Sequence, residues 1–154
     1  MIETPQVTDT ASQHTAVIHF RIARADMAAV MAPGVGELLA VLAEQGIVPA
    51  GPLFAHHARM EPGVFDFDLG FPVATPVTAQ GRVHPSQLLP TRVARTTYHG
   101  AYEGLSDGWG ELMAWIEATG HKPGPDLWES YVSGPESGPD PGQWRTQLNR
   151  PLVA

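Results

Sequence analysis

An internal repeat is the feature of this sequence that most constrains its fold. When the chain is shifted by 74 residues, residues 34–58 align with residues 108–132 without a gap, and eight of the 25 pairs are identical. Average composition would give roughly two identities. Further along, Leu69 and Pro72 match Leu148 and Pro151 at a spacing of 79, so about five residues are inserted in the Gly/Pro-rich segment 134–142. The chain therefore contains one structural unit twice.

Each copy has the pattern of a strand, a helix and two further strands. The first strand is expected at 16–23 and again at 91–98. The helix follows, because apolar residues recur at i, i+3, i+4 and i+7 in both copies: Val35, Leu38, Leu39 and Leu42, then Trp109, Leu112, Met113 and Ile116. Gly46 and Gly120 stand where a helix commonly ends in a left-handed glycine. Alternating and β-rich segments predict the remaining strands at 53–60, 64–71, 127–133 and 143–150.

These elements predict an α+β fold made of a duplicated βαββ module with pseudo-twofold symmetry. We expect antiparallel sheets with the two helices packed on one side, and a ligand cleft between the repeats. The expected organisation is a flexible N-terminus (1–15) followed by one domain (16–152), in which repeat one (16–73) is joined to repeat two (91–152) by a proline-rich connector (74–90).

Charge and composition exclude several classes of function. Nine Lys and Arg against 16 Asp and Glu give a net charge of −7, which disfavours direct contact with nucleic acid or with an anionic membrane. The sequence shows no signal peptide and no apolar run approaching the ~20 residues that span a bilayer, so we expect a cytoplasmic protein. Without cysteine there is no thiolate nucleophile or Cys-ligated zinc. His56 and His57 are adjacent in a strand and point to opposite faces, so no metal or other cofactor is expected.

Function is sought where the two copies differ. Ala55 corresponds to Glu129, and His57 corresponds to Tyr131. Residues two apart in a strand share a face, so Glu129 and Tyr131 lie side by side. Glu is poorly suited to a strand, and such a local inconsistency often marks a functional site. The alternative is that this face of the strand is simply solvated.

A carboxylate beside aromatic rings suits a cation, or a general acid or base if burial raises its pKa. Trp144 is the aromatic residue nearest in register on the facing strand. Tyr98 and Tyr102, at the strand-to-helix corner of repeat two, either line the pocket or pack in the core. Trp109 belongs to the apolar helix stripe and is expected to be a packing residue.

Several segments resemble the sequence blocks of the GyrI-like small-molecule-binding domain family: VFDFDLGFPV (64–73), YHGAYEGL (98–105), WESY with Gly134 and Pro135 (128–135), and DPGQWRTQLNRPL (140–152). The resemblance covers residues 16–152. It implies a duplicated βαββ fold, which agrees with the repeat. In that family the domain is the effector-binding part of AraC- and MerR-type multidrug regulators, and a Glu at the position of Glu129 meets the cationic group of an apolar ligand. This chain has no helix-turn-helix before the domain, so the resemblance implies a stand-alone member.

Three functions remain open at this stage. The first is binding of a small, mostly apolar and often cationic or planar molecule, with Glu129, Tyr131, Trp144, His57, Tyr98 and Tyr102 as ligand contacts. The second is hydrolysis of electrophilic, cyclopropane-type molecules, as some stand-alone members of the family are hydrolases, with Glu129 and Tyr131 as catalytic residues. The third is interaction with a protein such as DNA gyrase. If His57 faces a cationic ligand, its protonation near pH 6.5 is expected to weaken binding.

Overall fold

The computed structural model describes residues 1–58 and 61–153. The chain forms two compact units. The repeat-one unit is Ala11–Pro90, and the repeat-two unit is Met1–Thr10 together with Thr91–Ala154. The connector is thus part of the repeat-one unit, and the N-terminal segment is part of the repeat-two unit.

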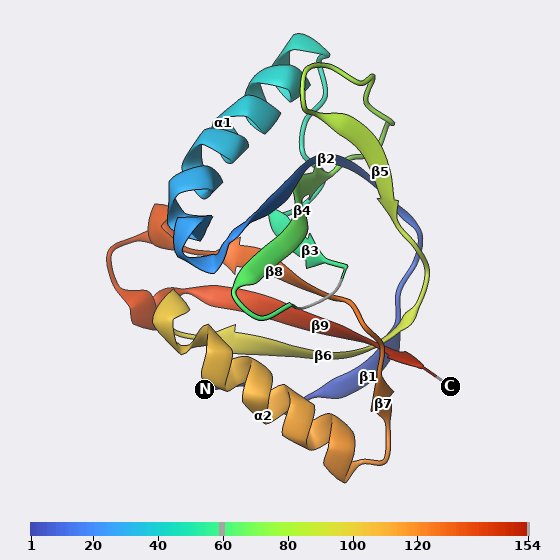
Figure 1. Cartoon of the computed structure of the whole chain (residues 1–154), viewed down its shortest axis with the longest axis vertical. Helices are drawn as coiled ribbons and strands as arrows, with labels where there is room; N and C mark the ends of the chain where they lie inside the picture. Colours follow the sequence, from blue (N-terminus) through green and yellow to red (C-terminus); the bar gives the residue numbers. More distant parts are fainter. Residues whose placement is uncertain (59–60, 154) are drawn as a thin grey trace. The chain divides into compact units, whose positions relative to one another are not determined.

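The repeat-one unit is a four-stranded antiparallel sheet with one helix (Figure 1). Its elements are β2 (Gln13–Ala23), α1 (Met27–Glu44), β3 (Phe54–His57), β4 (Val64–Pro72) and β5 (His84–Leu88). The strand order is β3-β4-β2-β5. The strand expected at 53–60 is seen as β3, and its last two expected residues, Arg59 and Met60, lie outside the described residues.

The repeat-two unit has the same βαββ order and adds two short strands (Figure 1). Its elements are β1 (Gln6–Asp9), β6 (Arg92–His99), α2 (Leu105–Ala118), β7 (Lys122–Pro123), β8 (Leu127–Ser133) and β9 (Arg145–Val153). The strand order is β1-β6-β9-β8, and β7 pairs with the end of β9. β1 falls in the segment expected to be flexible. Its polar sequence carries no strand pattern, and its position comes from backbone pairing along the edge of β6.

Strand pairing shows how the two repeats correspond. Leu69 pairs with Ile18, and its counterpart Leu148 pairs with Thr96, so the first strands correspond at a spacing of 78. The spacing of 75 implied by the expected strands 16–23 and 91–98 is therefore wrong. The helix sequences align at a spacing of 74, which is four less than the spacing of the first strands. The difference is about one helical turn, because α1 has 18 residues and α2 has 14.

Each helix packs closely on its own sheet over a glycine. A Cβ on Gly34 of α1 would lie 3.0 Å from Leu69 and 3.2 Å from Phe20, and a Cβ on Gly108 of α2 would lie 2.8 Å from Tyr98. Phe20 and Tyr98 correspond at the spacing of 78. The identity of Gly34 and Gly108 in the repeat is thus explained by an aromatic ring packed directly beneath each helix. Gly46 and Gly120 have positive φ angles of 67° and 78°, as expected for helix ends.

The core of each unit lies between the helix and the sheet. In α1 the fully buried residues include Leu38 and Leu42, whereas Leu39 is 43% exposed, so the expected stripe is rotated toward Gly34 and Val41. In α2, Leu112 and Ile116 are buried against Leu148, as expected.

The first helical segment is long and apolar. Arg24–Glu44 has 21 residues and contains an 18-residue window with a mean hydropathy of 1.5, enough by length and composition to cross a membrane. The expectation that no apolar run approaches this length is therefore wrong. In the structure this helix buries Leu38 and Leu42 in the core of the repeat-one unit, and 22% of the apolar window is buried.

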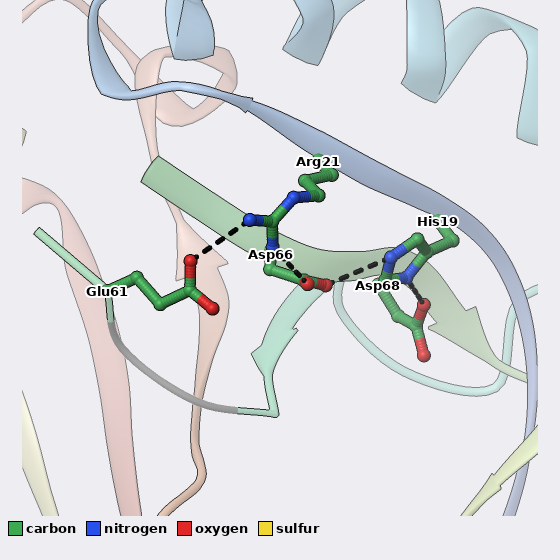
Figure 2. A network of polar contacts seen from close by, with 5 residues as sticks. All are labelled: His19, Arg21, Glu61, Asp66 and Asp68. Carbon is green, nitrogen blue, oxygen red and sulfur yellow. Dashed lines mark hydrogen bonds and ion pairs between the residues drawn. The ribbon is translucent and has the colours of Figure 1, made fainter. Parts of the chain in front are cut away.

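Part of the opposite face of the repeat-one sheet is polar (Figure 2). The ring nitrogens of His19 on β2 lie 2.9 Å from Asp66 and 2.8 Å from Asp68 on β4. Arg21 continues the network to Asp66 and Glu61 at 3.0 and 3.1 Å. Cross-strand pairs of opposite charge thus occupy the side of the sheet that α1 does not cover.

Candidate functional site

A hydrogen-bonded group on the helix-covered face of the repeat-two unit contains Glu129, Tyr131 and Trp109, all of them half-buried. Glu129 pairs with Leu148 of the core, which places its side chain on the same face as α2. The indole Nε1 of Trp109 on α2 donates to Glu129 Oε1 at 2.7 Å, and the hydroxyl of Tyr131 donates to Oε2 at 2.8 Å. Each carboxylate oxygen therefore has one neutral donor, and the alternative of a simply solvated Glu129 face is excluded.

The electrostatics of this group are set by burial and by its two hydrogen bonds. Burial raises the pKa of Glu129, and the hydrogen bonds from Trp109 and Tyr131 oppose that rise. Burial and the neighbouring Glu129 raise the pKa of Tyr131 well above its usual value, so the phenol stays neutral. Within the described part of the chain, no Lys, Arg or His forms an ion pair with Glu129. A carboxylate in this setting gains most from a positive charge brought close to it.

Two further aromatic residues extend from Tyr131. The ring of Tyr102 lies edge-on to Tyr131, with centroids 6.0 Å apart, and stacks obliquely on Trp144 at 5.3 Å. The indole of Trp144 donates to Gly138 O, which fixes the ring. The structure therefore brings four of the six predicted ligand contacts together in the repeat-two unit: Glu129, Tyr131, Tyr102 and Trp144.

Tyr98 does not belong to this group. It is 5% exposed, packs beneath α2 and donates its hydroxyl to Ala101 O at 2.8 Å. It is a core residue that supports the corner from which Tyr102 projects.

His57 lies in the repeat-one unit, at the position on β3 that corresponds to Tyr131. It is 4% exposed and stacks on Phe67, with centroids 5.1 Å apart, and its Nδ1 has no hydrogen-bond partner. Burial lowers the pKa of His57 to about 4. The expectation that it titrates near pH 6.5 is therefore wrong, because desolvation opposes its protonation. Whether His57 contacts a ligand stays a prediction.

No group of three or more His, Asp or Glu side chains within residues 1–58 and 61–153 is arranged to hold a metal ion. Two surface depressions of about 620 and 230 Å³ lie in the repeat-two unit, and neither is lined by Glu129 or Tyr131. Tyr102, 38% exposed, is the most accessible of these four grouped residues.

Trp109 is the member of this hydrogen-bonded group that the sequence analysis expected to be a packing residue. It does contact the core cluster, but its indole N–H is committed to Glu129. The repeat contains the signal that could have found it. Trp109 corresponds to Val35 at the same spacing of 74 that relates Glu129 to Ala55 and Tyr131 to His57. All three differences fall on residues that touch one another.

Comparison with known proteins shows the fold to which this arrangement belongs. No protein-family model matches the chain, and no curated protein matches it. Among solved structures, the C-terminal domain of EcmrR superposes with a TM-score of 0.82 and 17% identity over 97% of each chain. In the EcmrR–DNA complex the TM-score is 0.85, and this chain spans 57% of the length of that one.

Two other structures are similar over nearly the whole chain. SAV2435 bound to tetraphenylphosphonium gives a TM-score of 0.73 at 12% identity, over 99% of this chain and 95% of that one. A hydrolase encoded by lin2189 from Listeria innocua gives 0.68 at 14% identity, over 97% and 91%. The chain thus has the same α+β fold as these structures. The resemblance to the GyrI-like family is confirmed at the level of the fold.

Proposed function

We propose that the repeat-two unit binds a small, largely apolar cation, with Glu129 as its counter-ion. The carrying observation is that Glu129 is half-buried, accepts from two neutral donors and has no cationic partner among the described residues. Burying an ionised carboxylate without a counter-charge is costly, and a ligand cation relieves that cost.

The aromatic residues give the proposed ligand its apolar and planar character. Tyr102, Tyr131 and Trp144 form a continuous set of rings next to the carboxylate. Aromatic faces attract cations and stack on planar groups. Because Tyr102 lies against Tyr131, we propose that its ring moves aside when a ligand reaches Glu129. The likeness of the fold to that of SAV2435, solved with tetraphenylphosphonium, supports a ligand of this class.

The test is a titration with tetraphenylphosphonium and with neutral triphenylphosphine oxide, followed by calorimetry and Trp fluorescence at pH 7.5. Glu129→Gln keeps the size of the side chain and removes its charge. We expect at least a tenfold loss of affinity for the cation and less than about a threefold change for the neutral compound. Glu117→Gln, an exposed carboxylate on α2, is the matched control and leaves both affinities unchanged. Equal losses for the two compounds in Glu129→Gln would remove the charge argument.

A hydrolase of electrophilic small molecules is the second candidate. It is favoured by the raised pKa of Glu129, which suits a general acid, with Tyr131 as a hydrogen-bonded partner. The likeness of the fold to that of a Listeria innocua hydrolase supports it. Incubation of a cyclopropane substrate with stoichiometric protein separates the candidates, because a binding protein returns the substrate unchanged.

We further propose that this chain acts in the cytoplasm without direct contact to nucleic acid. The net charge of −7 opposes binding to phosphates. An electrophoretic mobility shift at low salt with random duplex DNA tests this, and a retarded band at micromolar protein would contradict it.

A further inference from the structure

A second polar site lies on the face of the repeat-two sheet that α2 does not cover. A depression of about 230 Å³ is lined there by Gln6 and Thr8 of β1 and by Arg95 and Thr97 of β6. Gln6 pairs directly with Arg95, and residues two apart in a strand share a face, so these four side chains form one surface. Glu129 lies on the opposite face of the same sheet.

Arg95 is a half-buried cation without a carboxylate partner. Its Nε donates to Asn149 Oδ1 at 2.6 Å, and within residues 1–58 and 61–153 it forms no ion pair. By contrast, Arg21, Arg82 and Arg92 each pair with a carboxylate. Burial lowers the pKa of Arg95, with no acidic group opposing the effect. In a chain with a net charge of −7, Arg95 is thus a positive charge in a depression that has no ion-pair partner among the described residues.

Asn149 fixes the direction of the guanidinium. Asn149 is fully buried, and its Nδ2 donates to Gln147 Oε1 at 3.3 Å, which assigns its Oδ1 to Arg95. With Nε engaged in this way, the two Nη groups are the donors left for the depression. The two NH₂ groups of a guanidinium form a planar fork that matches two oxygens of a carboxylate or phosphate.

Repeat one has apolar residues at the positions that correspond to Arg95 and Asn149. Arg95 and Asn149 correspond to Val17 and Gly70, which pair in the same way. A Cβ on Gly70 would lie 2.3 Å from Ala16 O, so no side chain fits there. The polar pair is therefore specific to repeat two.

We propose that Arg95, with Gln6, Thr8 and Thr97, binds a small oxyanion, either a carboxylate or a phosphate group. The guanidinium fork supplies the charge, and the amide and hydroxyl groups supply further donors around it. The one carboxylate in the depression, Glu3, lies at its edge, 2.5 Å from His99 Nε2. Glu3 is thus engaged by His99 and forms no ion pair with Arg95 among the described residues.

The experiment is an amide chemical-shift titration of the full chain with inorganic phosphate and with acetate, at ionic strength held constant with chloride. We expect saturable shifts at residues 6, 8, 95 and 97, and the tighter anion identifies the ligand group. At ten times the dissociation constant, the bound anion should raise the Tm by about 3 °C.

Arg95→Gln should weaken the preferred anion at least tenfold, and Arg95→Lys, which keeps the charge but not the fork, should weaken it less. Arg92→Gln, on the same strand but paired with Asp9, is the matched control and should bind as the wild type. Thr97→Val gives a test that leaves Arg95 and Asn149 intact, should Arg95→Gln fail to fold. The absence of saturable shifts up to 50 mM of either anion, or equal shifts in Arg95→Gln and wild type, would overturn the proposal. Tetraphenylphosphonium affinity in Arg95→Lys reports separately on the Glu129 site.

Discussion

Trp109 and Glu129 lie 20 residues apart in the chain and are joined by a 2.7 Å hydrogen bond from the indole Nε1 to a carboxylate oxygen. The bond ties α2 to β8 and stabilises the charged form of Glu129. Both residues stand where the two repeats differ, because repeat one has Val35 and Ala55 at these positions. The two repeats therefore differ at both residues of this one helix-to-strand contact.

Trp109→Phe is expected to shift the pH dependence of cation binding upward. Binding needs ionised Glu129, so it is lost as the pH falls through the pKa of that residue. The indole hydrogen bond lowers this pKa, and its removal lets burial raise it further. Tetraphenylphosphonium affinity between pH 5 and 8 should fall at a higher pH in the variant than in the wild type. An unchanged midpoint would show that the indole does not stabilise the charged carboxylate.

Glu129→Gln is expected to stabilise the unliganded protein at neutral pH by about 1 kcal/mol, because functional buried charges commonly reduce stability. The folded-state pKa of Glu129 is raised, so the unfolded chain ionises first as the pH rises. The wild type thus loses stability relative to the variant above the unfolded pKa, and the two converge in acid. Urea unfolding at pH 4 and pH 8 measures the difference, and a variant less stable at pH 8 would contradict the expectation.

His57→Phe is expected to make the free energy of unfolding less sensitive to acid. Burial lowers the pKa of His57 from 6.5 to about 4, so the unfolded chain takes up a proton first as the pH falls. The neutral histidine thus contributes stability above pH 6.5 that is lost progressively toward pH 4, by about 3 kcal/mol in total. The phenyl ring retains stacking on Phe67 and has no unpaired Nδ1. Unfolding free energies of the two proteins should diverge between pH 6.5 and 4, and parallel curves would count against burial of a neutral imidazole.

The repeat predicts most of the architecture because hydrophobic periodicity and turn glycines act locally. The αL glycines 46 and 120 and the strand at Leu127–Ser133 are found where expected. The register of the first strands could not be predicted in this way. The alternating pattern of a strand does not reveal an extra helical turn in the helix that follows it. Such a turn at the start of α1 changes the spacing between equivalent residues of the two repeats from 74 in the helices to 78 in the first strands.

The candidate site was predictable in part. Glu129 and Tyr131 follow from the difference between copies, and Tyr102 and Trp144 follow from aromatic residues near them in the pattern. Trp109 could not be separated from its apolar stripe, because a tryptophan can pack its ring in the core and still donate its N–H elsewhere. Arg95 gave no sequence signal, since its meaning depends on Asn149, 54 residues away.

Gly70→Ala and Gly36→Ala are expected to have opposite effects on the free energy of unfolding. At Gly70 a Cβ would meet backbone, Ala16 O at 2.3 Å, so the strands must separate and the unfolding free energy should fall by more than about 2 kcal/mol. At Gly36, exposed in α1, a Cβ meets nothing within 4 Å, and alanine should stabilise the helix by about 0.5–1 kcal/mol. Thermal unfolding of both variants checks the pair, and a tolerated Gly70→Ala would show that β2 and β4 can adjust.

The close approach of α1 to its sheet over Gly34 makes repeat one a ready template for engineering. Val35, Ala55 and His57 already occupy the backbone positions that hold Trp109, Glu129 and Tyr131 in the other copy. Replacing them with Trp, Glu and Tyr would place a carboxylate with an indole donor and a phenol donor on the corresponding backbone of repeat one. If the proposed site in repeat two binds a ligand, the altered protein would offer a second site of the same design and could bind two ligands.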